Sequence, residues 1–370
     1  MATTYFVRKS GSDANSGLSA ALAKLTIQAA INLATTAGDT VYVGAGSYRE
    51  TVTLAASGSA GNVISIIGDY AGTQTGDAGV VRLTGSADDL VGTRSYCINS
   101  SARSYVTIRG LLLDGYTSQG IRLSSSPSNI TIDQCYIDIG ANDTAHGLTT
   151  DGASQAAIAI KNCVFVRTRY GNAIWLTTAT ANAGHTITSC VFIGGADNAR
   201  AMDSAVGGVA IRNCYVLGGM YGFAASGLPG GYTAVTINNC LIEGCTYAIN
   251  SGTAGMITEN YNRFWANAVN RTNVSTGANS LTGPPLHDRR WFFNSVAGGT
   301  VLTPYDLASY SPSVELNSGS GAPSTDLRGA SQTGSYREWG PLEYNAALSV
   351  SGGSALGLPI VGSAIVRGAE

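Results

Sequence analysis

A seven-residue phrase returns through the middle of this chain at a nearly constant spacing. It reads TIDQCYI at 131–137, and then AIKNCVF at 159–165, TITSCVF at 186–192, AIRNCYV at 210–216 and TINNCLI at 236–242. Its cysteines, at positions 135, 163, 190, 214 and 240, are 28, 27, 24 and 26 residues apart. A repeat of this length is typical of a stacked architecture, in which each unit buries its apolar face against its neighbours.

The pattern inside the phrase favours β-strands. Apolar and polar residues alternate, a polar pair interrupts them, and the alternation then resumes with Val, Ile, Thr, Tyr and Phe. This order is typical of a strand, a tight turn and a second strand. A repeat of about 26 residues holds three short strands and leaves no room for a crossover helix. We therefore predict an all-β fold, a parallel β-solenoid.

The repeated cysteines are predicted to lie in the core. The chain has seven cysteines, an odd number, and five of them follow the repeat. Stacked at one position per coil, they fit as small apolar side chains better than as a disulfide framework. Cys240 and Cys245 are too far from any histidine in the sequence to suggest a zinc site.

Composition and charge exclude several classes of protein. Charged residues make up only 12% of the chain, the formal net charge is −2, and no basic run occurs, which argues against nucleic-acid binding. No apolar run reaches the roughly 18 residues of a membrane span. The opening MATTYFVRKS lacks the apolar region of a secretory signal, so we expect none.

The chain begins with a short strand, TYFVR, and one segment with helical spacing. Residues 24–36 place Leu25, Ala29 or Ala30, and Leu33 on one face, with Thr26 available as an N-cap. Because the open end of a solenoid exposes sheet edges, we expect this helix to cover the N-terminal end.

Two segments carry a family resemblance. The stretch KSGSDANSGLSAALAKLTIQAAINLATTAGDTVYVGAGSYRE at 9–50 resembles the first coil of pectate-lyase-like right-handed parallel β-helix proteins. The stretch at 311–344, with DLRG and a later EY pair, is similar to their closing segment. The resemblance implies the right-handed fold. It does not imply one chemistry, because lyases, hydrolases, binding modules and phage spikes share this fold.

These observations divide the chain into four parts. Residues 1–50 are expected to form the N-terminal strand, capping helix and first coil, and 51–260 the regular coils. The period is lost over residues 251–310, and 261–344 are expected to form an irregular closing region. The apolar tail 345–370 is expected either to make subunit contacts or to add a final strand pair to the end of the coils.

The resemblance implies that the ligand groove is formed by the strand after each cysteine strand and by the loops beside it. Alternation along these strands gives one outward column made of Arg122, Thr149, Trp175, Asp203, Ala224 and Asn250. The next outward column along the strands is made of Ser124, Asp151, Thr177, Ala205 and Ser226. Sugar rings that carry carboxylate groups are bound by aromatic faces and by the guanidinium groups of arginines. We therefore predict a carbohydrate site formed by Arg122, Trp175, Tyr221, Tyr247 and Asn250. The alternative is that Trp175 packs under a flanking loop such as 140–145.

A catalytic pair can be drawn on the same surface. Asp151 and Asp203 lie two coils apart, roughly 9–10 Å by the strand spacing, near the upper limit for an inverting glycosidase. His146 lies in the same region. The alternative is that these aspartates bond backbone amides at the coil corners. A lyase needs a base, and Arg122, Arg167, Arg169 and Arg200 are candidates, but no complete lyase constellation is present.

A cation site is a further possibility. Asp114 and Asp138 each lie three residues after the cysteine position on adjacent coils. Like charges so placed indicate either a bound cation or simple solvation at the coil edge. The resemblance makes Ca²⁺ the natural candidate. The three histidines are too far apart in sequence for a metal triad, and we otherwise expect no cofactor.

Three functions remain. The first is a non-catalytic virion surface protein of a bacteriophage, a spike, fibre or capsid decoration that binds host-surface carbohydrate as a homo-trimer beside capsid or tail proteins. Its basis is the solenoid, the sparse lysine and the apolar tail. The second is a polysaccharide lyase or inverting glycoside hydrolase acting on an acidic polysaccharide. The third is a structural assembly protein without a sugar ligand. The expected location is the virion or, alternatively, outside the cell or on its surface.

Overall fold

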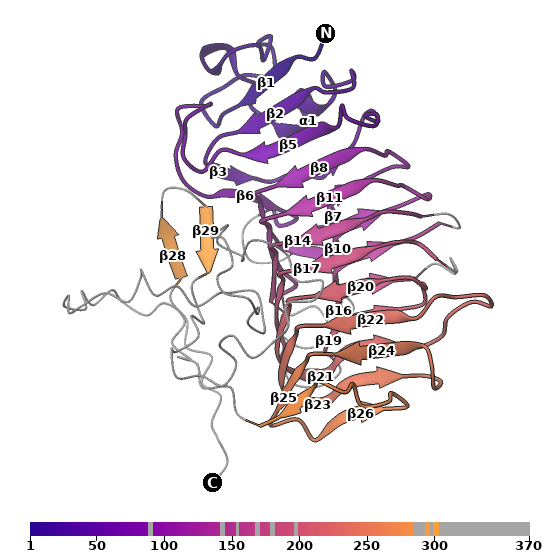
Figure 1. Cartoon of the computed structure of the whole chain (residues 1–370). Helices are drawn as coiled ribbons and strands as arrows, with labels where there is room; N and C mark the ends of the chain where they lie inside the picture. Colours follow the sequence, from indigo (N-terminus) through magenta and orange to yellow (C-terminus); the bar gives the residue numbers. More distant parts are fainter. Residues whose placement is uncertain are drawn as a thin grey trace, which may run out of the picture.

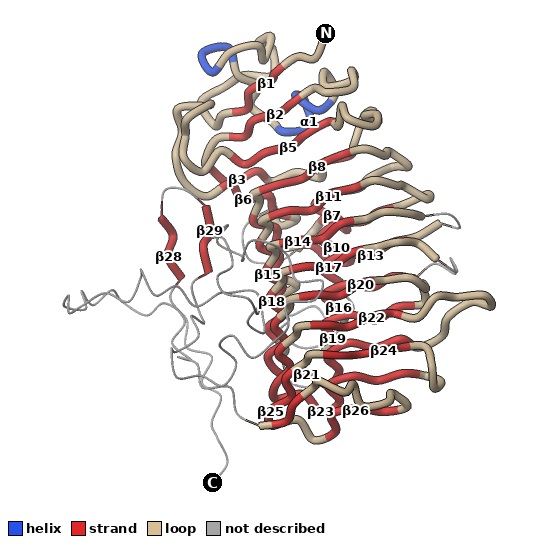
Figure 2. Tube along the Cα trace, viewed as in Figure 1, coloured by secondary structure: helices blue, strands red, loops and turns tan. Residues whose placement is uncertain are grey.

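The computed structural model of this chain describes residues 1–87, 92–140, 145–152, 155–166, 171–177, 182–195 and 199–283, and two strands at 293–296 and 299–302. Its strands stack in about 8 coils along one long axis (Figure 1). Helix occurs only near the N-terminal end, and strands and loops make up the rest of the described chain (Figure 2). The predicted all-β parallel solenoid is confirmed.

One wall of the solenoid is a ten-stranded parallel sheet that runs along its whole described length. Its strands, in spatial order, are β1 (Thr4–Val7), β2 (Thr40–Val43), β5 (Ile64–Gly68), β8 (Val106–Arg109), β11 (Ile130–Asp133), β14 (Ala159–Lys161), β17 (Thr186–Thr188), β20 (Ala210–Arg212), β22 (Val235–Asn238) and β24 (Ile257–Asn260).

The remaining coil strands form a seventeen-stranded sheet made of two rows. The β12 row comprises β3 (Gly46–Tyr48), β6 (Val81–Thr84), β9 (Leu112–Asp114), β12 (Tyr136–Asp138), β15 (Val164–Val166), β18 (Val191–Ile193), β25 (Arg263–Trp265), β27 (Leu281–Thr282) and the first parts of β21 (Tyr215–Ala225) and β23 (Leu241–Ser251). The β13 row comprises β4 (Val52–Thr53), β7 (Arg94–Asn99), β10 (Tyr116–Leu123), β13 (His146–Thr150), β16 (Asn172–Leu176), β19 (Arg200–Ser204), β26 (Val269–Thr272) and the later parts of β21 and β23. A separate antiparallel hairpin joins β28 (Phe293–Val296) to β29 (Gly299–Leu302).

The repeated phrase forms the corner between the ten-stranded sheet and the β12 row. The residue before each cysteine has a positive φ, from 51° to 58°, at Gln134, Asn162, Ser189, Asn213 and Asn239. This left-handed conformation turns the chain sharply within one residue. The five repeated cysteines behind the corner are at most 2% exposed. All seven cysteines of the chain are free thiols, as the core interpretation requires.

Like residues stack along the interior. Ile132 pairs with Ile160, and the same inward column continues through Ile187, Ile211 and Ile237. The Phe165 and Phe192 rings stack with their centroids 5.2 Å apart, and Phe223 meets Phe192 edge-on at 5.9 Å. Each coil thus buries its apolar residues against the next, as the repeat predicts.

The N-terminal helix is shorter than predicted and turns a different face inward. α1 covers only Ile27–Ile31 and contacts β1, β2 and β4. Thr26 is the N-cap, as expected, and its hydroxyl accepts from the Ala29 amide at 3.2 Å. The buried residues are Ile27, Ala30 and Ile31, however, and Leu33 is 37% exposed. The Glu50 carboxylate accepts from the amides of Ile27 and Gln28 at 2.8 and 2.9 Å and so fixes the first turn of the helix.

The coils continue past residue 260, although the sequence loses its period there. β25 pairs with β23, and β27 pairs with β25 in parallel register. Asn262 occupies the cysteine position of this coil, fully buried, and its amide donates to the Ile237 carbonyl at 2.8 Å. The rest of the predicted closing region and the tail 345–370 lie, apart from the hairpin, outside the described residues. No helix in the described ranges is long and apolar enough to span a membrane.

Candidate functional site

The outer face of the β13 row carries the predicted column in the predicted alignment. Arg122 pairs with Thr149, Thr149 with Trp175, and Trp175 with Asp203. The column then continues through Ala224 to Asn250. The sequence pattern thus located every member of this column, because side chains alternate strictly along each strand.

Another column lies three residues earlier on the same strands, beside the first. Asn172 pairs with Arg200, Arg200 with Tyr221, and Tyr221 with Tyr247. The two tyrosine rings stack, with centroids 5.1 Å apart and an interplanar angle of 15°. The Arg200 guanidinium lies over the Tyr221 ring, 4.7 Å from its centroid. Tyr221 and Tyr247 therefore form one aromatic surface beside Asp203 and Asn250.

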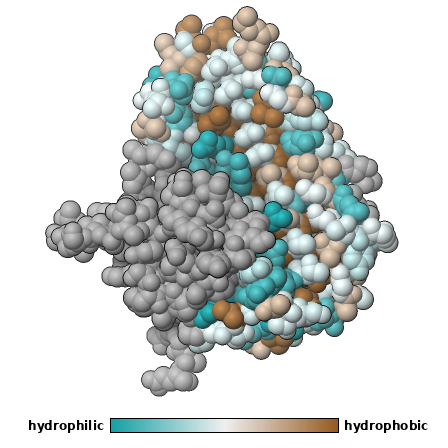
Figure 3. Space-filling model, in the orientation of Figure 1, coloured by the Kyte–Doolittle hydropathy of each residue, from teal (hydrophilic) through white to brown (hydrophobic). Residues whose placement is uncertain are grey.

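Trp175 stands at the middle of this face with 37% of its surface exposed. Its ring lies 4.6 Å from the His146 ring, centroid to centroid. It is therefore available at the surface. The alternative, packing of Trp175 under the loop 140–145, concerns positions 141–144, which lie outside the described residues. Figure 3 shows the molecule in the orientation of Figure 1, and on that face hydrophobic and hydrophilic residues are interspersed.

His146 is held as a hydrogen-bond acceptor. Its Nδ1 atom accepts from the Asn172 amide at 3.0 Å. Burial lowers the pKa of His146 to about 4. The imidazole is thus neutral near neutral pH, and a role as a proton donor there is not supported by this arrangement.

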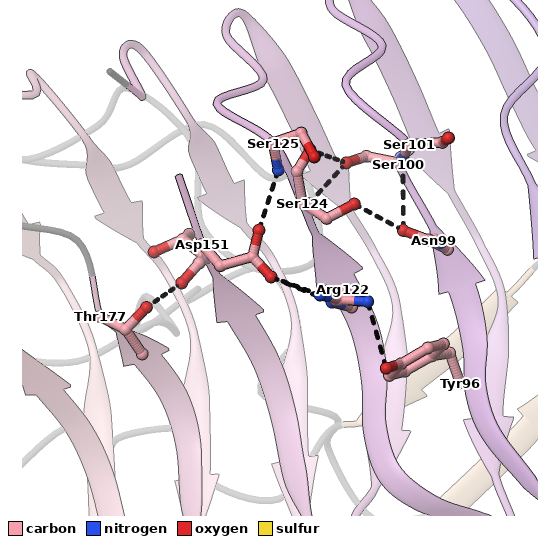
Figure 4. A network of polar contacts seen from close by, with 10 residues as sticks. Tyr96, Asn99, Ser100, Ser101, Arg122, Ser124, Ser125, Asp151 and Thr177 are labelled. Carbon is pink, nitrogen blue, oxygen red and sulfur yellow. Dashed lines mark hydrogen bonds and ion pairs between the residues drawn. The ribbon is translucent and has the colours of Figure 1, made fainter. Parts of the chain in front are cut away.

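Asp151 belongs to a polar network that crosses three coils (Figure 4). Its Oδ2 atom accepts from Arg122 Nε and Nη2 at 3.0 and 2.8 Å, and its Oδ1 atom accepts from the Ser125 amide at 2.8 Å. Arg122 also donates to the Tyr96 hydroxyl at 3.2 Å. Ser124 continues the network by donating to Asn99 at 2.8 Å. The aspartate bonds a backbone amide at a coil corner, which is the alternative that the sequence left open.

Asp203 is also held by neighbouring side chains, but it is buried far more deeply than Asp151. It is 5% exposed, forms an ion pair with Arg200, and accepts from the Ser226 hydroxyl at 2.8 Å. Its partners lie on its own coil and on the following coil, whereas the partners of Asp151 lie on the preceding coil. The two carboxylates therefore turn away from each other along the helix axis.

The proposed catalytic pair is not brought together. Asp203 is in register with Thr149, two residues before Asp151, so two coils and two residues separate the carboxylates. At the usual strand dimensions this places their Cα atoms about 12 Å apart. An inverting pair needs its carboxyl groups roughly 6.5–9.5 Å apart and facing the same bond. The two-residue offset and the opposite directions of the side chains thus exclude the predicted catalytic pair.

Asp114 and Asp138 lie on adjacent coils, one residue beyond the paired Leu113 and Ile137. Arg82 Nε donates a hydrogen bond to Asp114 Oδ2 at 2.8 Å, and the Gly140 amide donates one to Asp138 Oδ1 at 2.9 Å. Burial and the nearby Asp114 raise the pKa of Asp138. Calcium takes six to eight oxygen ligands, and the described residues contain no group of three His, Cys, Asp or Glu side chains that could hold a metal. This pair fits calcium poorly.

The arginines considered as lyase bases either form ion pairs or lie outside the described residues. Arg122 and Arg200 are ion-paired with Asp151 and Asp203. Lys161 lies in the ten-stranded sheet, 3.8 Å from Asp133, away from the outward columns as expected. Arg167 and Arg169 lie outside the described residues. The part of the chain that the structure describes therefore supplies no arginine base in the groove.

A separate pocket of about 300 Å³ lies at the edge of the ten-stranded sheet. Tyr42, Tyr70 and Arg109 contribute to its walls. The sequence pattern did not point to this pocket, because its residues come from four successive coils, the first three of which lack the cysteine phrase. Its position on another wall separates it from the columns of the β13 row.

No protein-family model matches the sequence, and no curated protein matches it. Among solved structures, the pectate lyase Pel9A is similar over 93% of this chain and 96% of its own, with a TM-score of 0.61 and 16% identity. An alginate lyase from Paenibacillus sp. str. FPU-7 covers 70% of this chain and 97% of its own, with a TM-score of 0.46 and 15% identity. A GH136 lacto-N-biosidase from Eubacterium ramulus covers 76% of this chain and 68% of its own, with a TM-score of 0.41 and 10% identity.

The match to Pel9A extends over almost the whole of both chains, so it concerns the stacking of the coils and not one motif. It agrees with the parallel pairing described above and with the two sequence segments that resemble pectate-lyase-like proteins. This chain therefore has the parallel β-helix fold of the pectate lyase Pel9A.

Proposed function

We propose that the outer face of the β13 row binds a glycan without cleaving it. The observation that carries the proposal is the aromatic ladder formed by the exposed Trp175 and the stacked pair Tyr221 and Tyr247. Aromatic faces stack on the apolar faces of sugar rings, and neighbouring polar groups bond the hydroxyls. Asn250 and the Arg122 network supply such groups beside the rings.

The geometry suits an extended ligand. Coils repeat about every 4.8 Å, a spacing comparable to the length of one sugar residue in a chain. Trp175 and Tyr221 are separated by two coils along the axis. A glycan running along the axis could therefore meet an aromatic ring and a polar group in turn. A single small ligand does not need such a stripe.

The balance of charge favours a glycan of low charge. Arg122 is paired with Asp151, and Arg200 with Asp203. Each arginine is already neutralised by a neighbour, so an added carboxylate on the sugar gains little from it and must compete with the aspartate. This supports a neutral glycan over the acidic polysaccharide of the lyase alternative.

Several observations support recognition in place of catalysis. Asp151 and Asp203 turn away from each other, His146 accepts a backbone hydrogen bond, and both groove arginines are ion-paired. Pel9A is a pectate lyase; from it we carry over only the class of ligand, carbohydrate. A location on a bacteriophage virion and assembly as a homo-trimer are parts of the same proposal, and neighbouring capsid or tail genes and sedimentation of the full chain test them.

The decisive experiment compares glycan-array binding of the parent protein with that of Trp175→Ala. We expect at least a tenfold loss of affinity for the bound glycans. Tyr42→Ala is the matched control, since Tyr42 is a half-buried aromatic residue on the ten-stranded sheet, and it should bind as the parent does. Equal binding by parent and Trp175→Ala would refute the site. Release of shortened sugars from a bound polysaccharide would replace recognition with catalysis.

A further inference from the structure

The pocket at the edge of the ten-stranded sheet has an aromatic end and a cationic end. Tyr42 pairs with Ile67, and Ile67 pairs with Arg109, so these three pocket residues lie on successive coils. Their strands β2, β5 and β8 follow one another along this wall (Figure 1). Tyr42 and Arg109 are therefore two coil steps apart, about 10 Å. The space between them, over Ile67, can take one ring-shaped ligand.

The side wall of the pocket is the loop between β5 and β6, and two aspartates hold its shape. Asp69 Oδ2 accepts from the amides of Gln74 and Thr75 at 2.8 and 2.6 Å. Farther along the loop, Asp77 accepts from Arg8 Nε and Nη2 at 2.8 and 2.6 Å. These hydrogen bonds form the wall before a ligand arrives, so binding needs little ordering of the chain.

Tyr70 brings a second aromatic ring to the pocket. It is 8% exposed, and its ring lies close to Gly110. A Cβ atom at Gly110 would lie 3.0 Å from Cε2 of the ring, and Gly110 has a φ of 73°. Glycine thus fits this position without displacing the ring or straining the backbone. Tyr42 and Tyr70 together give the pocket two aromatic side chains against which a sugar ring can pack.

The groups that the pocket offers to a ligand include strong hydrogen-bond donors. Arg109 Nε donates to Gln134 Oε1 at 2.8 Å, which leaves the NH2 group of this amide to a ligand. Within the described ranges, neither Nη group of Arg109 has a hydrogen-bond partner. Two adjacent Nη groups form the fork with which an arginine binds a carboxylate.

The carboxylates near Arg109 are already occupied by other groups. Asp133 Oδ1 accepts from the Asn162 side chain at 2.9 Å. Its Oδ2 atom lies 3.8 Å from both Arg109 and Lys161. Asp69 is 6% exposed and accepts hydrogen bonds at both oxygens from its own loop. Arg109 thus shares one distant carboxylate with a second cation, whereas the ion-paired arginines of the β13 row each contact a carboxylate directly.

We propose that this pocket binds one acidic sugar, a single ring that carries a carboxylate. Arg109 binds the carboxylate through its Nη groups, Gln134 donates to a ligand oxygen, and the ring packs against Tyr42. A volume of about 300 Å³ lies at the lower end of small-molecule pockets, which suits one ring and not an extended chain. The site goes beyond the function proposed above, because it lies on another wall and takes a charged ligand.

Ligand-observed NMR titration of the full-length protein tests the proposal by measuring the dissociation constants of five probes. Glucuronate and galacturonate are the acidic sugars, glucose and galactose are their neutral counterparts, and acetate is a carboxylate without a ring. At least one acidic sugar should bind saturably. Its neutral counterpart and acetate should each bind at least tenfold more weakly, because each lacks one half of the recognition.

Arg109→Gln should weaken binding of the acidic sugar at least tenfold. Tyr42→Ala should weaken it at least threefold, although the same variant leaves neutral-glycan binding by the β13 row unchanged. Arg212→Gln is the matched control and should bind as the parent does, since Arg212 lies in the same outward column, four coils farther along. Arg109 is exposed, and circular dichroism establishes that each variant keeps its coils.

A parent protein that binds neither acidic sugar saturably overturns the proposal. So does acetate that binds as tightly as the acidic sugars, since the pocket then holds an anion only, or an equal loss of affinity in Arg109→Gln and Arg212→Gln. Trp175→Ala should keep acidic-sugar binding, and its loss there would move the ligand to the β13 row. Arg109→Gln should keep the parent's binding of neutral glycans, so each of the two sites can fail without the other.

Discussion

Arg122 donates to Asp151 from both Nε and Nη2, and both hydrogen bonds end on one oxygen, Oδ2. The other oxygen, Oδ1, accepts from the amide of Ser125. Asp151 thus ties its own corner to the preceding coil through a side chain and through the backbone. The same aspartate that the sequence offered as a catalyst serves here to join two coils.

The Arg122–Asp151 pair should contribute little stability by its charge. Both side chains are more than a third exposed, at 35% and 40%, so solvent screens the pair. Asp151→Asn keeps an oxygen for Ser125 and should lower the free energy of unfolding by about 0.5 kcal/mol. A double-mutant cycle with Arg122→Gln, followed by denaturant unfolding, measures the coupling. A coupling above about 2 kcal/mol would show that the pair is better shielded than its exposure implies.

The alignment of the groove could be predicted from the sequence because the repeat fixes it. Once Ile121 and Leu148 were assigned to the interior, strand alternation placed Arg122 and Thr149 side by side, and the structure pairs them so. The directions of the carboxylates could not be predicted. Asp151 and Asp203 each have partners on a neighbouring coil, and a one-dimensional pattern does not show whether a side chain leans toward the preceding or the following coil.

The end of the regular coils was harder to predict, because polar residues replace apolar ones there. Asn262 takes the cysteine position, and Glu259 is in register with the inward Ile237. Glu259 is satisfied by Arg271 at 2.7 Å and by the Ser280 hydroxyl at 2.5 Å. A hydrogen-bonded polar interior has the same backbone as an apolar one but lacks its hydrophobic periodicity.

Ser189 offers a test of the corner conformation. It has a φ of 52°, and its hydroxyl is buried without a hydrogen-bond partner among the described residues. Ser189→Ala removes the unpaired hydroxyl and should raise the free energy of unfolding by about 1 kcal/mol. Ser189→Gly also relieves the left-handed strain, roughly 1 kcal/mol, and should be the more stable of the two. Thermal unfolding compares them, and the reverse order would contradict the strain argument.

The repeated cysteines should be unreactive in the folded protein. They are at most 2% exposed, and burial raises the pKa of Cys163, Cys190 and Cys214 well above the usual thiol value. The thiolate is the reactive form. Iodoacetamide at pH 8 should therefore label none of the seven cysteines before unfolding and all seven in denaturant, as counted by mass spectrometry. Labelling of Cys190 in the native state would place the cysteine column outside the core.

Asp138→Asn should stabilise the protein at neutral and alkaline pH. Burial, followed by the nearby Asp114, raises the pKa of Asp138. A carboxyl whose pKa is higher in the folded state favours folding when protonated, at low pH, and loses that contribution as pH rises through the folded-state pKa. The neutral amide avoids the loss. The melting temperature of Asp138→Asn should exceed that of the parent at pH 8, and the difference should shrink toward pH 4. Added Ca²⁺ should not raise the parent's melting temperature.

His185 should make the protein sensitive to acid. It is 2% exposed, its Nδ1 atom accepts from the Ile158 amide at 3.2 Å, and burial lowers its pKa to about 4. An imidazole with a lowered pKa favours folding when neutral, so its contribution is complete above the unfolded pKa of about 6.5. It is lost as pH falls from there toward 4, and His146 behaves in the same way. Together the two histidines should lower the free energy of unfolding by several kcal/mol between pH 7 and pH 4. NMR titration should find both rings neutral at pH 6, and His185→Gln should flatten the fall in stability; a ring that titrates near pH 6.5 would contradict its burial.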